Sequence, residues 1–202
     1  MSNKPDVNIF WFRRDLRFFD NTGLFQALSS GKPVLPVFIF DKNILAKLEK
    51  PNDLRVQYIH AALSSMQNEL IGIGSAIKCY YTSPEKAFED LLANYRIGTV
   101  FTNHDYEDYA LKRDQSIGDL LANNGTGFET FKDQVVFEKL EVCKDDGSPY
   151  TVFTPYSRKW KAHLLSYPIS FSHSEKLLGN CYIHNDKAIP SLEEMGFLEQ
   201  AW

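Results

Sequence analysis

The feature of this sequence that most constrains its fold is the alternation of short apolar runs with amphipathic segments over residues 1–131. Short apolar runs are typical of strands buried on both faces of a sheet, and the segments between them carry apolar residues at helical spacing. We predict strands at residues 7–12, 34–40, 77–81, 99–102 and 128–131. Helices are predicted to follow the capping residues Asp20–Thr22, to begin near Asp53 and Ser83, and to span residues 106–123.

The longest of these helices begins near Asp53 and is amphipathic. Its buried face is predicted to carry Leu54, Tyr58, Ala62, Met66, Leu70 and Ile73. Gly72 and Gly74 follow this helix rather than a strand, which indicates a C-cap turn and not a phosphate-binding loop. Ser83 is predicted to cap the next helix, with Pro84 at the first position, where a missing N–H costs nothing.

Strands that alternate with helices favour a parallel sheet with helices on both faces. Right-handed crossovers then predict an α/β, Rossmann-like fold with five strands in the flavodoxin-like order 3-2-1-4-5. The first and fourth strands are neighbours in that order, and a ligand is expected beyond their carboxyl ends. The residues there are 12–15 and 103–107, with Asp41 beside them.

Residues 132–202 have a different pattern, and we predict two parts, an α/β domain at 1–131 and a connector at 132–202. The connector has a strand-like run at Tyr150–Phe153, a helical stretch near residues 155–165, and a capped segment in which Ser191 precedes Glu194 by three. It is rich in aromatic residues, so we expect it to pack along the first domain and to lead to a second domain beyond Trp202.

Composition limits the classes of function. The 202 residues carry 22 Lys and Arg against 26 Asp and Glu, a net charge of −4, so the surface as a whole is not a nucleic-acid platform. The three cysteines are widely spaced and indicate reduced thiols. His173, Cys181 and His184 match no standard metal site. No stretch reaches the roughly 20 apolar residues of a membrane span, so we expect a cytoplasmic protein.

Four blocks of sequence resemble the photolyase/cryptochrome family, and they occur in the order that the family shows. They are IFWFRRDLR at residues 9–17, VFIFD at 37–41, NHDYEDYALKRD at 103–114 and YTVFTPY at 150–156, with Trp160 after the last. The resemblance therefore covers nearly the whole chain, and it implies the antenna-binding N-terminal domain of a photolyase followed by the interdomain connector.

In the family, this domain holds an antenna chromophore that passes excitation to a FAD in a following helical domain, where reduced flavin splits pyrimidine dimers in DNA. The resemblance thus implies three partners: an antenna, the FAD domain of the same polypeptide, and damaged DNA bound through that domain. We expect this chain alone not to repair DNA. Two alternatives stay open, a cryptochrome photoreceptor and a free-standing α/β nucleotide-binding protein.

The resemblance also nominates site residues. In members that bind a deazaflavin, matching positions near the antenna are Phe38, Asp41, Arg55, Asp105 and Glu107. Arg14 is added because it lies in a cationic cluster with Arg13 and Arg17 beyond the first strand. The alternatives are that Phe38 belongs to the core, that Asp105 and Glu107 serve the helix that follows, and that the arginines pair with acids such as Asp15 or Asp114.

One departure from the family bears on the antenna. Folate-binding members of the bacterial type carry an Asn-Glu pair where this chain has Tyr109 and Ala110. The missing carboxylate removes a pterin contact. We therefore prefer a flavin or deazaflavin over folate, and an empty site is the remaining option.

Overall fold

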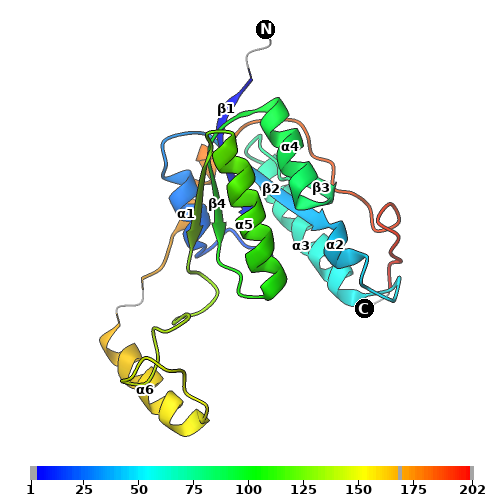
Figure 1. Ribbon diagram of the computed structural model, residues 1–202. Coiled ribbons are helices and arrows are strands. Elements are labelled where there is room, and N and C mark those ends of the chain that lie inside the picture. The colour runs from blue at the N-terminus through cyan, green and yellow to red at the C-terminus, as the bar shows by residue number, and fades with distance from the viewer. Residues whose placement is uncertain (1–3, 168–169, 201–202) are drawn as a thin grey trace.

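The computed structural model describes residues 4–167 and 170–200. It contains a five-stranded parallel sheet in the order β3-β2-β1-β4-β5, which confirms the predicted fold class (Figure 1). The strands are β1 (Asp6–Phe12), β2 (Val34–Asp41), β3 (Lys78–Thr82), β4 (Arg96–Asn103) and β5 (Gly127–Phe131). The helices are α1 (Thr22–Leu28), α2 (Lys42–Leu45), α3 (Leu54–Ile71), α4 (Pro84–Asn94), α5 (Asp108–Asn123), α6 (Phe153–Ser166) and the 3-10 helix η1 (Ser174–Asn180).

The predicted helix caps are present. Asn21 accepts a hydrogen bond from the Leu24 backbone N–H at 3.0 Å and so starts α1. Ser83 caps α4, whose first position is Pro84, and Gly72 ends α3. These local signals fix where the helices begin and end because each satisfies backbone groups that have no partner within the helix.

The sheet separates two hydrophobic cores, because successive side chains of a strand point to opposite faces. Phe10 and Phe12 of β1 pack with α1 and α3, whereas Ile9 and Trp11 pack with α4 and α5. Figure 1 shows α4 and α5 together on one side of the sheet. The same alternation carries Phe38 to the α3 side, while Val37 of β2 faces α4 and α5.

The predicted buried face of α3 is partly wrong. Tyr58 is 65% exposed and Ile73 is also exposed, while the buried residues are Val56, Gln57, Leu63, Met66, Gln67 and Leu70. The two glutamines are buried because they bond to backbone groups: Gln67 accepts from the Ile77 N–H at 2.6 Å and donates to the Lys187 carbonyl at 2.9 Å. A pattern that counts glutamine as solvent-facing misplaces this face.

Residues 170–200, which we call the return segment, pack along the sheet. Cys181 forms a parallel bridge with Val34, and Leu178, Met195 and Phe197 are buried in the core beside α1 and α3. A capping box is present as predicted, since Ser191 and Glu194 bond each other's backbone N–H groups with their side chains. This segment therefore completes the hydrophobic core on one side of the sheet.

Residues 132–167, which we call the arm, project away from the sheet (Figure 1). The predicted strand at Tyr150–Phe153 is wrong: this run pairs with no strand in the described parts of the chain, and Phe153 begins α6. Short apolar runs fit a strand or a helix equally well, and here no sheet edge lies beside the run. The arm packs on itself around Phe137, whose ring lies 5.6 Å from that of Trp160 and 5.3 Å from that of Tyr167.

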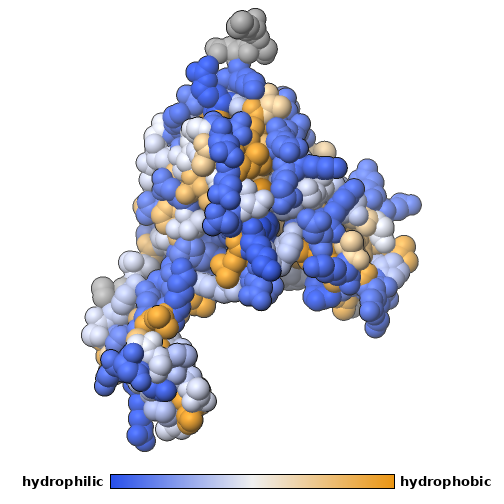
Figure 2. Space-filling view, in the orientation of Figure 1, coloured by the Kyte–Doolittle hydropathy of each residue, from blue (hydrophilic) through white to orange (hydrophobic). Residues whose placement is uncertain are grey.

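The arm exposes apolar side chains. Phe153 is 77% exposed and Leu165 is 91% exposed, and Figure 2 shows hydrophobic patches on the projecting part of the molecule. None of the helices in the described residues has both the length and the apolar character required to cross a bilayer. The fold thus consists of a layered sheet domain, completed by the return segment, and an arm in which few side chains are buried.

Candidate functional site

The carboxyl ends of β2, β1 and β4 form one edge of the sheet, because these strands are parallel neighbours. The adjacency of the first and fourth strands is as predicted. Asp41 ends β2, Arg13 and Arg14 follow β1, and Asn103 ends β4. Polar side chains from all three strands therefore meet at the predicted edge, and they divide into two groups.

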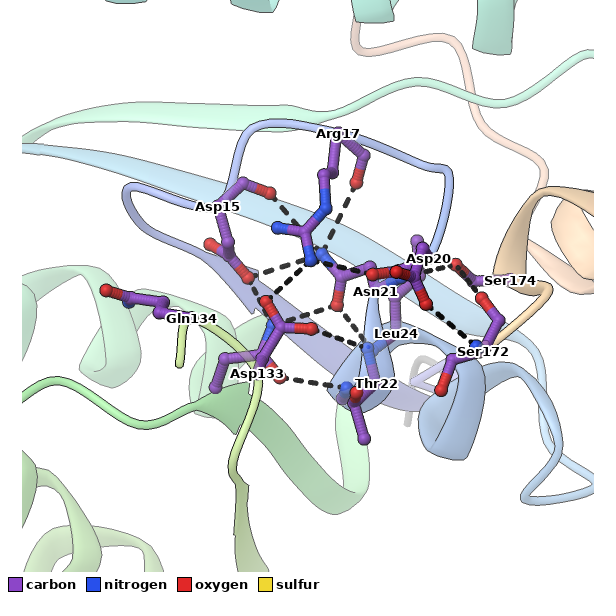
Figure 3. A network of polar contacts seen from close by, with 12 residues as sticks. Asp15, Arg17, Asp20, Asn21, Thr22, Leu24, Asp133, Gln134, Ser172 and Ser174 are labelled. Carbon is purple, nitrogen blue, oxygen red and sulfur yellow. Dashed lines mark hydrogen bonds and ion pairs between the residues drawn. The ribbon is translucent and has the colours of Figure 1, made fainter. Parts of the chain in front are cut away.

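The first group lies toward α1 and is buried (Figure 3). The Asn103 amide donates to Asp15 Oδ2 at 2.5 Å and to Asn21 Oδ1 at 2.8 Å, while its oxygen accepts from the Gly23 N–H at 2.8 Å. A Cβ on Gly23 would lie 2.6 Å from that oxygen, so only glycine fits here. Buried polar groups with complete hydrogen bonding hold a structure in one arrangement.

This group extends to both ends of the arm. Asp133 accepts from Arg17 at 2.8 Å and from the Thr22 N–H at 2.9 Å. At the return segment, Ser174 Oγ accepts from the Asn21 N–H at 3.1 Å and donates to the Phe18 carbonyl at 2.5 Å. We call Asp15, Asn21, Asn103, Asp133 and Ser174 the junction network. It ties the arm's exit and return to one loop between β1 and α1 (Figure 3).

Arg13 and Arg17 are structural, as one of the sequence interpretations held. The Arg13 guanidinium donates to both Asp114 oxygens at 2.8 and 2.7 Å, to Thr102 Oγ1 at 2.9 Å, and to the Asn103 carbonyl. Burial lowers the pKa of Arg13, and the Asp114 carboxylate opposes that effect. Arg17 is engaged by Asp133. Both guanidinium groups are thus paired with acceptors of the protein.

The second group lies toward α5 and is charged and partly exposed. Arg14 lies 3.0 Å from Glu107 and 3.3 Å from Asp105, so three predicted site residues come together. The Arg14 and Glu107 side chains are 51% and 70% exposed, whereas Asp105 is buried and also lies 3.8 Å from Arg113. Glu107 begins α5 without a side-chain cap, which leaves its carboxylate available to the site.

Tyr109 joins this group to Asp41. The Tyr109 hydroxyl on α5 donates to Asp41 Oδ2 at 2.5 Å, so this side chain links α5 to the end of β2. Burial, together with the hydrogen bond to Asp41, raises the pKa of Tyr109 to about 12. Asp41 also accepts from the Asn43 N–H at 2.9 Å and thereby caps α2. We call Arg14, Asp41, Asp105, Glu107 and Tyr109 the edge face.

Two residues of this region were not identified as site residues from sequence. Tyr109 was noted only where the chain departs from the folate pattern, and Arg113 was not considered. The Arg113 guanidinium lies 4.9 Å from the Trp11 ring and 5.9 Å from the Tyr109 ring. Tyr109 and Arg113 lie four residues, or one helical turn, apart on α5, and this spacing was the available signal.

Phe38 and Arg55 are not joined to the edge face within residues 4–167 and 170–200. Phe38 is buried on the α3 side of the sheet, with its ring 4.9 Å from that of Phe40. Arg55 is 75% exposed and pairs with Asp53 at 2.6 Å. Hydrogen bonding to Asp53 raises the pKa of Arg55.

A buried polar atom without a partner lies near the end of β2. The His60 Nε2 on α3 has no hydrogen-bond partner within the described chain, and the His60 ring lies 6.4 Å from that of Phe40. A pocket of about 510 Å³ lies elsewhere, at the amino edge of the sheet, lined by residues that include Lys32, Asn180 and Tyr182. That pocket contains none of the predicted site residues. We therefore place the candidate site at the edge face, where charged and aromatic side chains converge.

Comparisons with known proteins identify relatives over most of the chain. The family model for DNA photolyase matches residues 8–175. The deoxyribodipyrimidine photo-lyase of Halobacterium salinarum is 30% identical over 96% of this chain, which covers 41% of that protein. Cryptochrome-1 of Arabidopsis thaliana is 27% identical over 75% of this chain, which covers 22% of that protein.

Comparison with solved structures identifies the same family. A bacterial class III photolyase from Agrobacterium tumefaciens matches with a TM-score of 0.68 and 27% identity, over 80% of this chain and 33% of that one. An archaeal photolyase from Sulfolobus tokodaii, solved with two FAD molecules, matches with a TM-score of 0.59 and 31% identity, over 66% of this chain and 32% of that one. The chain thus spans about two fifths or less of the photolyases it resembles here. It belongs to the DNA photolyase family and represents that family's N-terminal α/β domain.

Proposed function

We propose that this chain is the light-harvesting domain of a photolyase and that it binds a flavin or deazaflavin antenna at the edge face. The observation that carries the proposal is the convergence of five polar and aromatic side chains at the carboxyl edge, beside the switch point between β1 and β4. Ligands of open α/β sheets bind at this place. The edge face is charged and partly exposed, whereas the junction network beside it is buried and fully bonded.

The residues present fit a flavin. A flavin ring has flat faces and a polar edge that donates and accepts hydrogen bonds, and its side chain can end in phosphate. Tyr109 supplies an aromatic surface, Asp41 and Asp105 supply acceptors, and Arg14 supplies an exposed cation.

A folate antenna of the bacterial type fits less well. The position that carries its glutamate is Ala110, which is buried on α5. Alanine supplies no carboxylate, so the contact that this glutamate makes with a pterin is missing. This favours a flavin or deazaflavin.

The chain's own residues would position the ligand and carry out no bond-making step. When bound, the antenna absorbs light and passes excitation to the FAD of the catalytic part. That transfer requires a fixed separation and orientation, so the protein must be rigid around the ligand. Tyr109 is held by its hydrogen bond to Asp41, and Asp105 lies between Arg14 and Arg113. Arg13, which neighbours Arg14, is fixed by Asp114. A rigid sheet edge of this kind suits orientation rather than acid or base chemistry.

The catalytic partner is inferred from the relatives' length. Because the photolyases compared above are more than twice as long as this chain, we propose that a FAD-binding helical domain of the same polypeptide splits pyrimidine dimers in DNA. The whole protein would then be a cytoplasmic carbon–carbon lyase, and this part alone would be inactive. The likeness to Cryptochrome-1 supports a second candidate, a photoreceptor that uses the same domain for sensing.

The experiment is a binding titration of the purified chain with FMN, FAD, a deazaflavin and methenyltetrahydrofolate, followed by fluorescence. We expect a flavin or the deazaflavin to bind and Arg14→Ala to weaken binding about tenfold. Lys159→Gln, which removes an ion pair on the arm, is the matched control and should bind as the wild type does. Failure of all the flavins to bind, or tight folate binding, would contradict the proposal. Dimer loss under blue light, assayed on the full-length gene product, separates photolyase from cryptochrome.

A further inference from the structure

The loop between β4 and α5 presents two opposite faces. Asp105 and Glu107 contact Arg14 and belong to the edge face. His104 and Tyr106, which alternate with them, contact the arm instead. Alternate side chains of an extended segment point in opposite directions, so this loop separates the binding site from the arm.

One carboxylate of the arm holds both arm-facing side chains. Glu138 Oε2 lies 2.7 Å from His104 Nδ1 and accepts a hydrogen bond from the Tyr106 hydroxyl, also at 2.7 Å. The Glu138 side chain is largely buried. A single buried oxygen thus restrains two residues of the loop that carries Asp105 and Glu107.

Glu138 is itself fixed by the arm. Its carbonyl accepts from the Glu141 N–H at 3.0 Å, and its N–H donates to Glu141 Oε2 at 2.7 Å. Lys132 in turn donates to both Glu141 oxygens at 2.8 Å. Lys139, next to Glu138, has a φ of 50°, a left-handed conformation that non-glycine residues adopt only when their surroundings impose it. The Glu138 carboxylate is therefore presented to the loop by an ordered turn.

The two halves of the loop depend on Glu138 to different degrees. His104 keeps other contacts: its N–H donates to the Phe131 carbonyl, its carbonyl accepts from Gln134, and Nε2 lies 3.0 Å from Thr130 Oγ1. For the Tyr106 hydroxyl, Glu138 is the partner found in the described chain. Loss of Glu138 should thus loosen the Asp105–Glu107 half of the loop more than its start.

We propose that Glu138 is a positioning residue for the edge face: through Tyr106 and His104, it holds the loop that presents Asp105 and Glu107 to the antenna. This inference rests on the proposed antenna function, and it assigns a role in that function to the arm, which lies outside the site. The alternative is that Glu138 stabilises only the arm, with no effect on the ligand.

The test compares FMN binding in Glu138→Ala, Glu138→Gln and Tyr106→Phe. We expect Glu138→Ala to weaken FMN binding about fivefold and to change the induced circular dichroism of the bound flavin. Glu138→Gln keeps an acceptor oxygen for Tyr106 and should bind within about twofold of wild type. Tyr106→Phe should weaken binding, and the Glu138→Ala/Tyr106→Phe double variant should lose little more than Glu138→Ala alone. Lys159→Gln is the arm control and should bind normally.

A second measurement works without a ligand. Hydrogen exchange of the backbone amides of residues 105–107 should be faster in Glu138→Ala than in wild type, while the thermal unfolding midpoint changes little. If wild type binds neither FMN nor FAD nor the deazaflavin, the antenna proposal is at fault, and the exchange measurement still decides the role of Glu138. Unchanged exchange at these amides, or wild-type FMN affinity in Glu138→Ala, overturns the inference. If Glu138→Ala does not fold, Tyr106→Phe tests the same link.

Discussion

The junction network and the edge face lie side by side at one edge of the sheet, and they differ in burial. Asn21 and Ser174 of the junction network are fully buried, and its amides, hydroxyls and carboxylates bond one another (Figure 3). In the edge face, Arg14 and Glu107 keep more than half of their side chains in solvent. A group whose bonds are completed inside the protein serves the fold, whereas an exposed and charged group remains available to a ligand.

The difference leads to opposite expectations for substitutions. Removing a member of the junction network leaves buried donors or acceptors unpaired, which costs folding free energy. Removing Arg14 or Glu107, the exposed members of the edge face, leaves their partners open to water, which costs little stability. The predictions below test this division, in order of decreasing free-energy change.

The largest effect is expected for Asn103→Ala. The change leaves Asp15, Asn21 and the Gly23 N–H without their shared partner, so the free energy of unfolding should fall by about 3 kcal/mol. Urea denaturation measures this. Glu107→Gln at the edge face is the comparison and should change stability by about 0.5 kcal/mol or less. Similar losses in the two variants would remove the distinction between the groups.

A smaller effect is expected for Asp133→Ala. The Thr22 N–H loses its acceptor and Arg17 keeps only the Asp20 carbonyl, so the free energy of unfolding should fall by about 1–2 kcal/mol. Because Asp133 holds the arm's exit, limited proteolysis should also cut within the arm faster than in wild type. Asp146→Ala, an exposed acid on the arm, is the control. Equal proteolysis rates in wild type and Asp133→Ala would show that the arm does not depend on this junction.

Tyr109→Phe should affect binding more than stability. The change removes the hydroxyl that joins α5 to Asp41, so flavin affinity should fall about tenfold, or about 1.4 kcal/mol. Asp41 keeps the Asn43 N–H, and the free energy of unfolding should fall by less than about 1 kcal/mol. Fluorescence titration and urea denaturation give the two values. Tyr156→Phe on the arm is the matched control, and an equal loss of affinity there would count against a local role.

The smallest effect is expected for Arg55→Ala. Arg55 is exposed and pairs with Asp53 on the surface, so stability should change by about 0.5 kcal/mol or less. If Arg55 reaches the ligand, flavin affinity should fall about threefold, which isothermal titration calorimetry can resolve. Arg158→Ala on α6 removes the same charge far along the chain as a control. Unchanged affinity in Arg55→Ala would restrict the site to the edge face.

Several features of the molecule could be predicted from sequence because they depend on local signals or on general topology rules. The strand order follows from alternating strands and helices with right-handed crossovers, and that order alone places Asp41, Arg14 and Asp105 at one edge. The caps at Asn21 and Ser83 involve residues only three apart. The pairing of Arg13 with Asp114 was foreseen as one alternative.

The sequence by itself therefore determined the sheet, its order and the edge at which the candidate site residues lie. Only the tertiary structure decided that Tyr109 meets Asp41, that Gln57 and Gln67 are buried, and that the connector divides into an arm and a return segment. These features depend on contacts between residues far apart in the chain. Local periodicity carries no information about them, because the partner that satisfies a buried polar group becomes known only when distant segments pack together.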